Sequence, residues 1–232
     1  MNRKWTNRIR FIMDECMPSF IRNSKWFMYP FYYYAYRGHN IAAAMDFKKN
    51  YFKWTPAELQ QFYENIQSVS TNRPTDISPN GLKFIIDQCT PDIASVLDIG
   101  CGKGYLLKLL HKHYPNLQLH GADFVEHAGV AEFPFTKADA KNLPIPDRSF
   151  DLVVCTHTIE HIYEADQLVH ELKRIAKKKL IVITPKQRYF YYTLDEHINF
   201  FPEKELLTSL INMSNYTCTN IDGDWVYTGY LQ

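Results

Sequence analysis

The chain has 232 residues, of which 46% are hydrophobic and 22% are charged. This composition excludes wholesale disorder, and no apolar run approaches the 18 residues that would predict a membrane-spanning helix. The net charge of +1 hides an asymmetry, because residues 1–54 carry ten lysines and arginines against three acidic residues. That segment has a net charge of +7, and the rest of the chain therefore sums to −6.

Cysteine usage bears on the compartment. The five cysteines are odd in number and scattered: Cys16, Cys89, Cys101, Cys155 and Cys218. This spacing predicts neither a disulfide framework nor a structural zinc site, and it is typical of a reducing compartment. The basic N-terminal residues lead into no apolar run, so no secretory signal is expected. We therefore expect a cytoplasmic protein.

The predicted elements begin with an aromatic segment that includes residues 26–36, followed from about residue 79 by alternating strands and helices. A helix is expected after the cap-like Ser78. Strands are expected over 94–99, 117–122, 136–138, 150–155 and 180–184, with helices from about 105 and over 165–176. Residues 177–179, three lysines, should form a solvated turn rather than a nucleic-acid patch. This alternation predicts a parallel, doubly wound sheet.

The C-terminal part predicts a different pairing. Asp222 and Gly223 separate two β-rich runs, 216–221 and 225–231. Asp-Gly between such runs is a strong hairpin signal, so the sheet should finish with an antiparallel pair.

The strand expected over 94–99 runs into a glycine-rich loop, Gly100 to Gly104, that precedes a helix. Such a loop lets a ligand approach the backbone closely. An NAD-binding protein would carry the pattern G-x-G-x-x-G, but here the third glycine arrives one residue early and Tyr105 takes its place. A carboxylate at Asp98 would repel a pyrophosphate but suits a ligand with ammonium and sulfonium charges. The spacing favours S-adenosylmethionine over NAD.

The run D-I-G-C-G-K-G, which starts at Asp98, resembles the first motif of the class I S-adenosylmethionine-dependent methyltransferases, closest to the small-molecule group called type 11. The resemblance covers roughly residues 79–232. It implies an α/β fold with a Rossmann-like, doubly wound seven-stranded sheet and an antiparallel last strand, preceded by an N-terminal helical and aromatic cap. We therefore expect a cap and lid region over residues 1–78 and a methyltransferase domain over residues 79–232.

The resemblance also implies a cofactor site for S-adenosylmethionine. Asp123 occupies the place of the family's ribose-binding acid, and Asp139 and Ala140 match its adenine-binding pair. Each aspartate alone could be a strand-end cap or a turn former, but three at ordered positions beside the loop favour the cofactor site. The predicted cofactor-binding residues are Asp98, Gly100, Cys101, Gly102, Tyr105, Asp123, Phe124, Asp139, Ala140 and Thr156.

Methyl transfer from a sulfonium needs mainly orientation and exclusion of water, with a general base only if the acceptor must lose a proton. His157 and His161 follow the strand at 150–155, at the sheet edge where ligands bind in this fold class. They are the predicted catalytic residues.

The same turn carries a metal hypothesis. The pattern H-x-x-E-H with the later His197 resembles an E-x-x-E-H…H site of ubiquinone-pathway O-methyltransferases and small-RNA 3′-terminal methyltransferases. His157, Glu160, His161 and His197 would then bind a divalent cation. Here His157 stands in place of the first glutamate, so the alternative is that Glu160 and His161 only pack and hydrogen-bond the turn. We expect no metal cofactor.

Three interpretations compete for residues 1–54. Their aromatic side chains could pack as a lid on the main domain, contact an anionic membrane surface together with the basic residues, or stack on nucleic-acid bases. No nucleic-acid-binding module is recognisable, so we favour membrane contact over nucleic acid. A cytoplasmic protein is therefore expected, with packing as a lid as the first interpretation of residues 1–54 and peripheral membrane contact as the alternative.

Taken together, the sequence predicts a methyltransferase that acts on a small-molecule or lipid-linked acceptor, at oxygen. The alternatives are an RNA or protein methyltransferase, or a catalytically idle S-adenosylmethionine-binding interaction protein. The tetrapeptide Thr156-His157-Thr158-Ile159 departs from the N/D-P-P-Y/F pattern of amino-methylating DNA enzymes. Nucleic acid is therefore not an expected partner.

Overall fold

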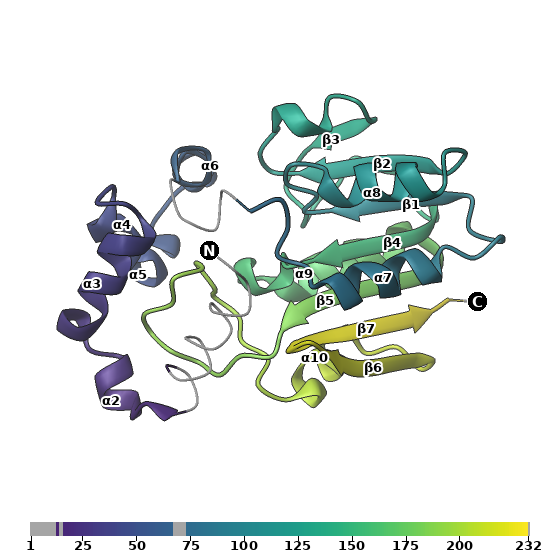
Figure 1. Cartoon of the computed structure of the whole chain (residues 1–232). Helices are drawn as coiled ribbons and strands as arrows, with labels where there is room; N and C mark the ends of the chain where they lie inside the picture. The colour runs from purple at the N-terminus through teal and green to yellow at the C-terminus, as the bar shows by residue number, and fades with distance from the viewer. Residues whose placement is uncertain (1–12, 14–15, 67–72, 232) are drawn as a thin grey trace. The chain divides into compact units, whose positions relative to one another are not determined.

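The structure is a computed structural model that describes residues 13, 16–66 and 73–231. The chain divides into two compact units (Figure 1). The N-terminal unit comprises residues 1–73 and 187–200, and the sheet unit comprises residues 74–186 and 201–232. These units differ from the predicted domain ranges, 1–78 and 79–232, mainly because residues 187–200 group with the N-terminal segment.

The sheet unit contains a seven-stranded mixed sheet in the order β3-β2-β1-β4-β5-β7-β6. Strands β1 to β5 pair in parallel, and β7 lies antiparallel between β5 and β6. This arrangement confirms the predicted fold class. The strands are β1 (Ser95–Ile99), β2 (Gln118–Asp123), β3 (Phe135–Lys137), β4 (Phe150–Thr156), β5 (Ala176–Pro185), β6 (Tyr216–Ile221) and β7 (Asp224–Tyr230).

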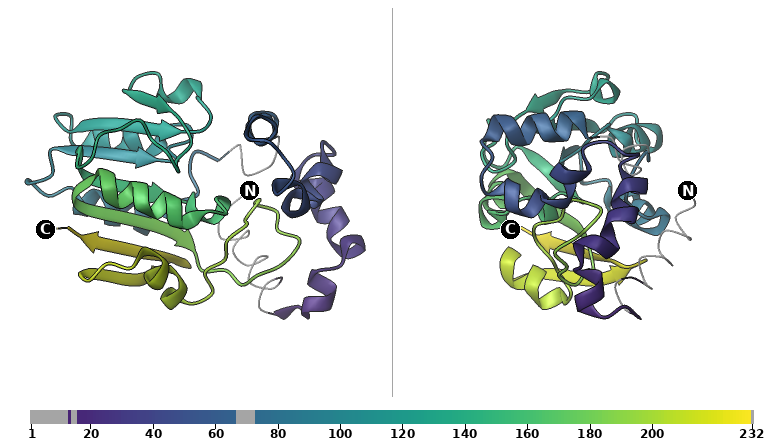
Figure 2. Two further views of the ribbon diagram at one scale, coloured as in Figure 1. Left: turned by 180° about the vertical axis from the view of Figure 1, so that it is seen from behind. Right: turned by 90° about the vertical axis from the view of Figure 1, so that its left-hand side faces the viewer.

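Helices cover both faces of this sheet (Figure 2). One face carries α7 (Pro79–Gln88) and α8 (Tyr105–His113), and the other carries α9 (Ala165–Ile175) and α10 (Lys204–Ile211). Successive strand residues point to opposite faces, so the side chains of β4 alternate between the two cores. Leu152 and Val154 pack with α7 and α8, whereas Val153 and Cys155 pack with α9 and α10.

Local signals explain where several elements begin. Ser78 caps α7 by accepting a hydrogen bond from the Gly81 amide at 2.9 Å, and Pro79 fits the first helical position. At the hairpin, Asp222 and Gly223 have φ values of 53° and 95°, as the two-residue turn of a right-twisted hairpin requires. The predicted antiparallel pair is confirmed.

The predicted turn over residues 177–179 is wrong, because β5 begins at Ala176 and includes the three lysines. The backbone of Lys179 pairs with both neighbouring strands, opposite Leu152 and Tyr230. Its ammonium group donates to the Gln88 carbonyl at 3.2 Å. Long lysine stems therefore let the strand continue while the charged ends reach polar partners.

The N-terminal unit is helical. Its helices are α2 (Ser19–Arg22), α3 (Lys25–Ala35), α4 (Ile41–Met45), α5 (Phe47–Tyr51) and α6 (Pro56–Asn65). Residues 187–200 close this unit through their backbone: Arg22 donates to the Tyr192 carbonyl, and Lys48 donates to the Tyr191 carbonyl at 2.9 Å. Among the described residues, every helix is too short or too polar to cross a lipid bilayer.

Candidate functional site

The glycine-rich loop crosses the carboxyl end of the sheet between β1 and α8. The amides of Gly100 and Cys101 both donate to the Ala122 carbonyl, at 2.8 and 3.2 Å, which holds the loop over the end of β2. Gly100, Gly102 and Gly104 have φ values of 76°, 50° and 71°, in the left-handed region that favours glycine. The loop conformation thus explains the glycine spacing.

Asp98 lies on β1 directly before this loop and is 2% exposed. Its Oδ1 has no hydrogen-bond partner among the described residues. Burial, together with a smaller effect of the neighbouring Asp123 carboxylate, raises the pKa of Asp98 to about 7. A buried carboxyl group without a partner is costly, so Asp98 is prepared to accept a cationic ligand.

Asp123 ends β2, beside the same loop. Its Oδ2 accepts a hydrogen bond from the Gly102 amide at 2.8 Å, and its Oδ1 accepts one from the Val125 amide at 3.0 Å. Each carboxylate oxygen has a second lone pair, so Asp123 keeps acceptor capacity for the two hydroxyl groups of a ribose. The main chain therefore fixes this carboxylate at the loop.

The space around the loop glycines is uneven. A Cβ on Gly100 would lie 2.0 Å from the Thr158 hydroxyl oxygen, and one on Gly104 would lie 2.9 Å from a methyl carbon of Val130. A Cβ on Gly102 would meet no atom of the described residues within 4 Å. The loop is packed on two sides and open at Gly102, so the residues present fit a cationic ligand that approaches the backbone there.

The predicted adenine-binding pair follows β3. Asp139 is exposed, and its Oδ1 accepts a hydrogen bond from the Lys141 amide at 3.0 Å. The Ala138 amide donates to the Asp123 carbonyl at 3.0 Å, which ties the start of this turn to the end of β2. Asp139 and Ala140 thus follow the strand next to Asp123, and their contact with adenine stays a prediction.

The remaining predicted cofactor residues lie at the same sheet edge, at the ends of elements. Thr156 is buried at the end of β4, Tyr105 opens α8, and Phe124 follows β2. Cys101 is buried in the loop, where burial and then the Asp98 carboxylate raise its thiol pKa far above the usual range. The thiol is therefore inert, and Cys101 acts as a small loop residue.

His157 lies directly after β4 with a φ of 49°, and its amide donates to the Ile183 carbonyl at 2.8 Å. Its Nδ1 lies 3.3 Å from Oε1 of Glu160, and its Nε2 lies 3.6 Å from Oδ2 of Asp224. Burial alone would lower the pKa of His157, but Asp224 and Glu160 outweigh it and raise the pKa to about 10. His157 is therefore a cation between two carboxylates, and this is a poor state for a general base.

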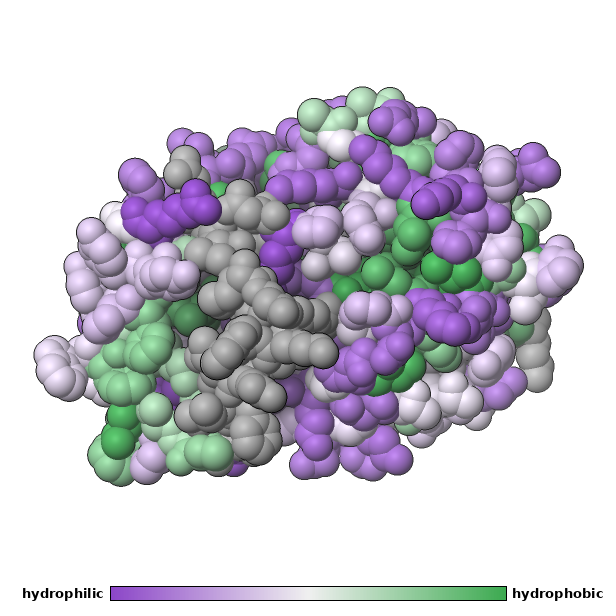
Figure 3. All heavy atoms as spheres, in the orientation of Figure 1, coloured by the Kyte–Doolittle hydropathy of each residue, from purple (hydrophilic) through white to green (hydrophobic). Residues whose placement is uncertain are grey.

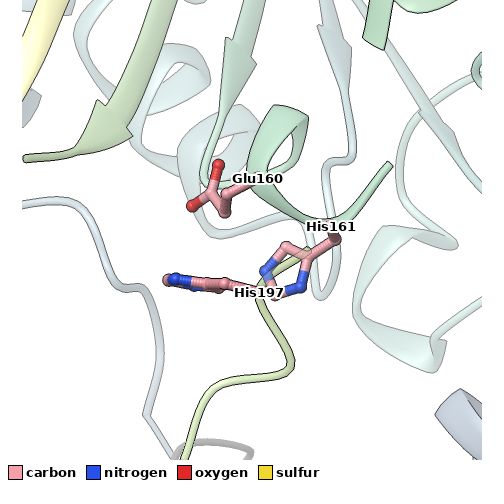
Figure 4. A group of neighbouring side chains, drawn as sticks. All are labelled: Glu160, His161 and His197. Carbon is pink, nitrogen blue, oxygen red and sulfur yellow. The ribbon is translucent and has the colours of Figure 1, made fainter. Parts of the chain in front are cut away.

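Glu160 and His161 lie on the short helix η4 (Ile159–His161), and His197 lies on the 187–200 segment (Figure 4). Glu160 faces His157 through one oxygen and accepts from the Thr184 hydroxyl at 3.0 Å through the other. Both carboxylate oxygens thus have partners within the sheet unit. His197 belongs to the other unit, so metal binding by these residues stays an untested hypothesis beside the expectation of no metal cofactor.

Sequence reasoning missed two residues of this edge, Asp224 and Thr158. Asp224 opens β7 and is 5% exposed, and Thr158 fills the space beside Gly100. For Asp224 the only sequence signal was an aspartate directly before the predicted last strand. Its partner His157 precedes it by 67 positions, so no local pattern links the two.

The chain resembles known proteins over this region. Residues 97–183 match the family model described as "Methyltransferase domain". A "probable S-adenosylmethionine-dependent methyltransferase" of Mycobacterium tuberculosis is 34% identical over 128 residues, which cover 50% of this chain and 46% of that protein. The ubiquinone biosynthesis O-methyltransferase of Azoarcus is 28% identical over 163 residues, covering 63% of this chain and 66% of that protein. The alignment thus spans about half the length of the mycobacterial relative.

Solved structures share the fold. A SAM-dependent methyltransferase of Thermotoga maritima has a TM-score of 0.52 at 18% identity, with 80% of this chain and 98% of that chain covered. A second one, from Aquifex aeolicus, has a TM-score of 0.50 at 19% identity, with 76% and 97% covered. At these identities the likeness concerns the fold alone.

Proposed function

We propose that this chain, whose residues 97–183 match the methyltransferase-domain model, is a class I S-adenosylmethionine-dependent methyltransferase that methylates an oxygen of a small-molecule or lipid-linked acceptor. The observation that carries the proposal is the buried Asp98, whose Oδ1 has no hydrogen-bond partner in the described part of the chain, beside the open Gly102 and the fixed Asp123. A negative charge in that place selects a cationic cofactor rather than a pyrophosphate.

S-adenosylmethionine, when bound, supplies a methyl group that is activated by a positively charged sulfur. The residues of this chain then bind and orient. Asp98 attracts the positive charge of the ligand, and Asp123 accepts from ribose hydroxyl groups while its own position is held by the Gly102 amide. Orientation and exclusion of water are what such a displacement requires from the protein.

Oxygen as the acceptor atom is supported by the Azoarcus relative, whose name states O-methylation and whose match covers 63% of this chain. Other relatives are named for nitrogen or carbon, such as ajmaline N-methyltransferase of Rauvolfia serpentina. A hydroxyl acceptor must lose its proton as the new carbon–oxygen bond forms. We propose that His161 accepts this proton. His157 is less suited, because its ring lies between the carboxylates of Glu160 and Asp224.

We also propose that the protein is cytoplasmic. All five cysteines are free thiols, and three of them are buried. Free thiols persist where the environment is reducing, which supports a cytoplasmic protein.

The test is transfer of a radiolabelled methyl group from S-adenosylmethionine into fractions of a host lysate: lipid, soluble metabolite, protein and nucleic acid. We expect label in the lipid or metabolite fraction. An ether product keeps its methyl group in alkali, so alkaline treatment should not release this label. The matched control is the Asp98→Asn/Asp123→Asn variant, which should leave no label above background.

The outcomes separate the alternatives. Label in RNA or protein would overturn the acceptor class and retain the reaction. No label in any fraction, with S-adenosylmethionine still bound, would favour an idle cofactor-binding protein. His161→Gln should lower the rate of transfer without changing cofactor affinity, and an unchanged rate would remove His161 as the base.

A further inference from the structure

Helix α3 is aromatic around its whole circumference. Its buried side carries Met28 and Tyr32, and the buried Tyr36 follows at the same spacing after the helix end. These three side chains belong to the core of the N-terminal unit. Phe27, Phe31 and Ala35 are partly buried and also pack against this core, so they widen the buried side. On an ordinary surface helix the side opposite such an apolar stripe is polar.

The opposite side of α3 is not polar. Trp26, Tyr29 and Tyr33 are exposed by 86%, 49% and 57%, and the exposed Pro30 lies among them. Spacings of three, four and seven residues place these side chains along one stripe of the helix. We call Trp26, Tyr29 and Tyr33 the aromatic stripe. A contiguous exposed apolar surface of this kind marks an interaction site.

The surroundings of the aromatic stripe add apolar area. Phe20 on the preceding helix α2 is 78% exposed. Apolar residues gather over α2 and the adjacent end of α3 in the space-filling view (Figure 3). The exposed surface therefore continues beyond the stripe within the same unit.

The charge around the stripe is mostly positive. Over residues 16–54 the sequence has six lysines and arginines and one acidic residue, Asp46. Two of the six, Arg22 and Lys48, donate to backbone carbonyls within the N-terminal unit. Arg37 is exposed directly after α3, and Lys25 at its start is 57% exposed and 3.6 Å from Asp46. Cations thus flank both ends of the aromatic stripe, and the sign complements a negatively charged surface.

We propose that the aromatic stripe of α3 binds the headgroup region of an anionic lipid bilayer. Tryptophan and tyrosine are the side chains that favour the boundary between water and lipid, because each joins an apolar ring to a polar group. At 11 residues α3 is about 16 Å long, so it lies in the plane of the interface instead of crossing the bilayer. Flanking cations add attraction to anionic headgroups.

The residue types favour lipid over the other occupants. A surface that tracks nucleic acid combines stacking rings with a continuous line of cations, whereas here the cations stand at the ends of α3 and none lies within the stripe. A contact between two copies of the chain would not require a negatively charged partner surface, so it would leave the flanking cations without a role. Lipid binding by the aromatic stripe is independent of methyl transfer and is measured without the cofactor.

The experiment is sedimentation of the full chain with vesicles, without S-adenosylmethionine. Vesicles of phosphatidylcholine alone are compared with vesicles that contain three parts phosphatidylglycerol to seven parts phosphatidylcholine. We expect binding to the anionic vesicles that weakens as salt is raised. Trp26→Gln/Tyr29→Gln/Tyr33→Gln should lower the partition coefficient by at least about tenfold, because glutamine keeps the helix but not the rings.

Two matched variants sharpen the test. Arg37→Gln should weaken binding about fivefold on anionic vesicles and leave neutral vesicles unaffected. Leu206→Gln removes an exposed apolar side chain from α10 of the other unit, 52% exposed, and should change nothing. Circular dichroism checks that each variant is folded.

Four outcomes would overturn the proposal. They are no sedimentation of the unmodified chain, equal binding by the triple glutamine variant, a concentration-dependent dimer that this variant abolishes, and binding of single-stranded RNA in place of vesicles. The last two would assign the stripe to a second copy of the chain or to nucleic acid.

Discussion

Asp98 shows how one buried side chain can serve as a selective element. Its carboxyl group is buried and lies near the Asp123 carboxylate, and its Oδ1 lacks a hydrogen-bond partner among the described residues. An arrangement of this kind costs folding free energy in the empty protein. A cationic ligand recovers that cost when it binds, so the same residue supplies both affinity and selectivity.

The raised pKa of Asp98 makes cofactor affinity depend on pH. The carboxylate form binds a cation, and with a pKa of about 7 this form is lost as the pH falls below 7. We expect the affinity for S-adenosylmethionine to decrease by about tenfold per pH unit below 7, measured by calorimetry between pH 5.5 and 8. In the Asp98→Asn variant the affinity should be low and independent of pH. If the affinity of the unmodified protein were also independent of pH, Asp98 would not be the group that binds the cation.

Protonated His157 stabilises the folded protein. Its pKa is about 10 in the folded protein against an ordinary value of 6.5, so the folded state holds the proton more tightly than the unfolded state does. The resulting stabilisation is complete below about pH 6.5 and is lost as the pH rises toward 10. The charge joins η4 to the start of β7 by pairing with Glu160 and Asp224.

We expect His157→Gln to lower the free energy of unfolding by roughly 3 kcal/mol at pH 7, because two buried carboxylates then lose their shared cation. The loss should shrink as the pH approaches 10, and denaturant unfolding at both pH values measures it. Asp224→Asn is the matched variant, since it removes one of the two acids and should cost less. An equal loss at pH 7 and pH 10 would mean that the proton on His157 plays no part.

At the scale of the elements, the turn from β1 into α8 contains one glycine that is required for packing and one that leaves space for a ligand. Gly100 and Gly102 both have positive φ values, but only Gly100 is in close contact with another element, through Thr158. The two glycines therefore have different reasons to lack a side chain.

Substitution by alanine should tell these two reasons apart. Gly102→Ala adds backbone strain of about 1 kcal/mol and no clash, so the protein should fold and lose at least about tenfold in S-adenosylmethionine affinity. Gly100→Ala should destabilise the protein by about 3 kcal/mol, because the new Cβ overlaps Thr158. Thermal unfolding and calorimetry measure the two effects. A Gly102→Ala variant with normal cofactor affinity would show that the open side of the loop is not used.

Sequence patterns predicted most elements of the sheet unit closely. Five strands, the helix capped by Ser78 and the Asp-Gly hairpin follow from periodicity and turn chemistry, which act over a few residues. The lysines at 177–179 misled this reasoning because a run of charges normally marks a solvated segment. In β5 the strand pairing on both sides outweighs that local preference.

At the scale of the whole molecule, the cofactor should stabilise the sheet unit. A ligand that binds only the folded state at one hundred times its Kd adds about 2.7 kcal/mol to the free energy of unfolding. We expect S-adenosylmethionine to raise the melting temperature and NAD at equal concentration to leave it unchanged. Trp225 lies buried in the sheet unit, so a variant with Trp5, Trp26 and Trp54 replaced by phenylalanine reports that unit's unfolding by fluorescence. Stabilisation by NAD alone would overturn the cofactor assignment.

The sequence by itself determined the alternation of strands and helices, the glycine loop and the order of Asp98, Asp123 and Asp139, because each depends on neighbours within a few positions. Tertiary structure alone decided that residues 187–200 join the N-terminal helices, and that Asp224 and Glu160 enclose His157. It also decided which side of α3 is buried, since an aromatic residue at every turn of that helix gives no polar face to read. Such contacts join residues far apart in the chain, and their energies depend on burial and on the partner that folding brings near.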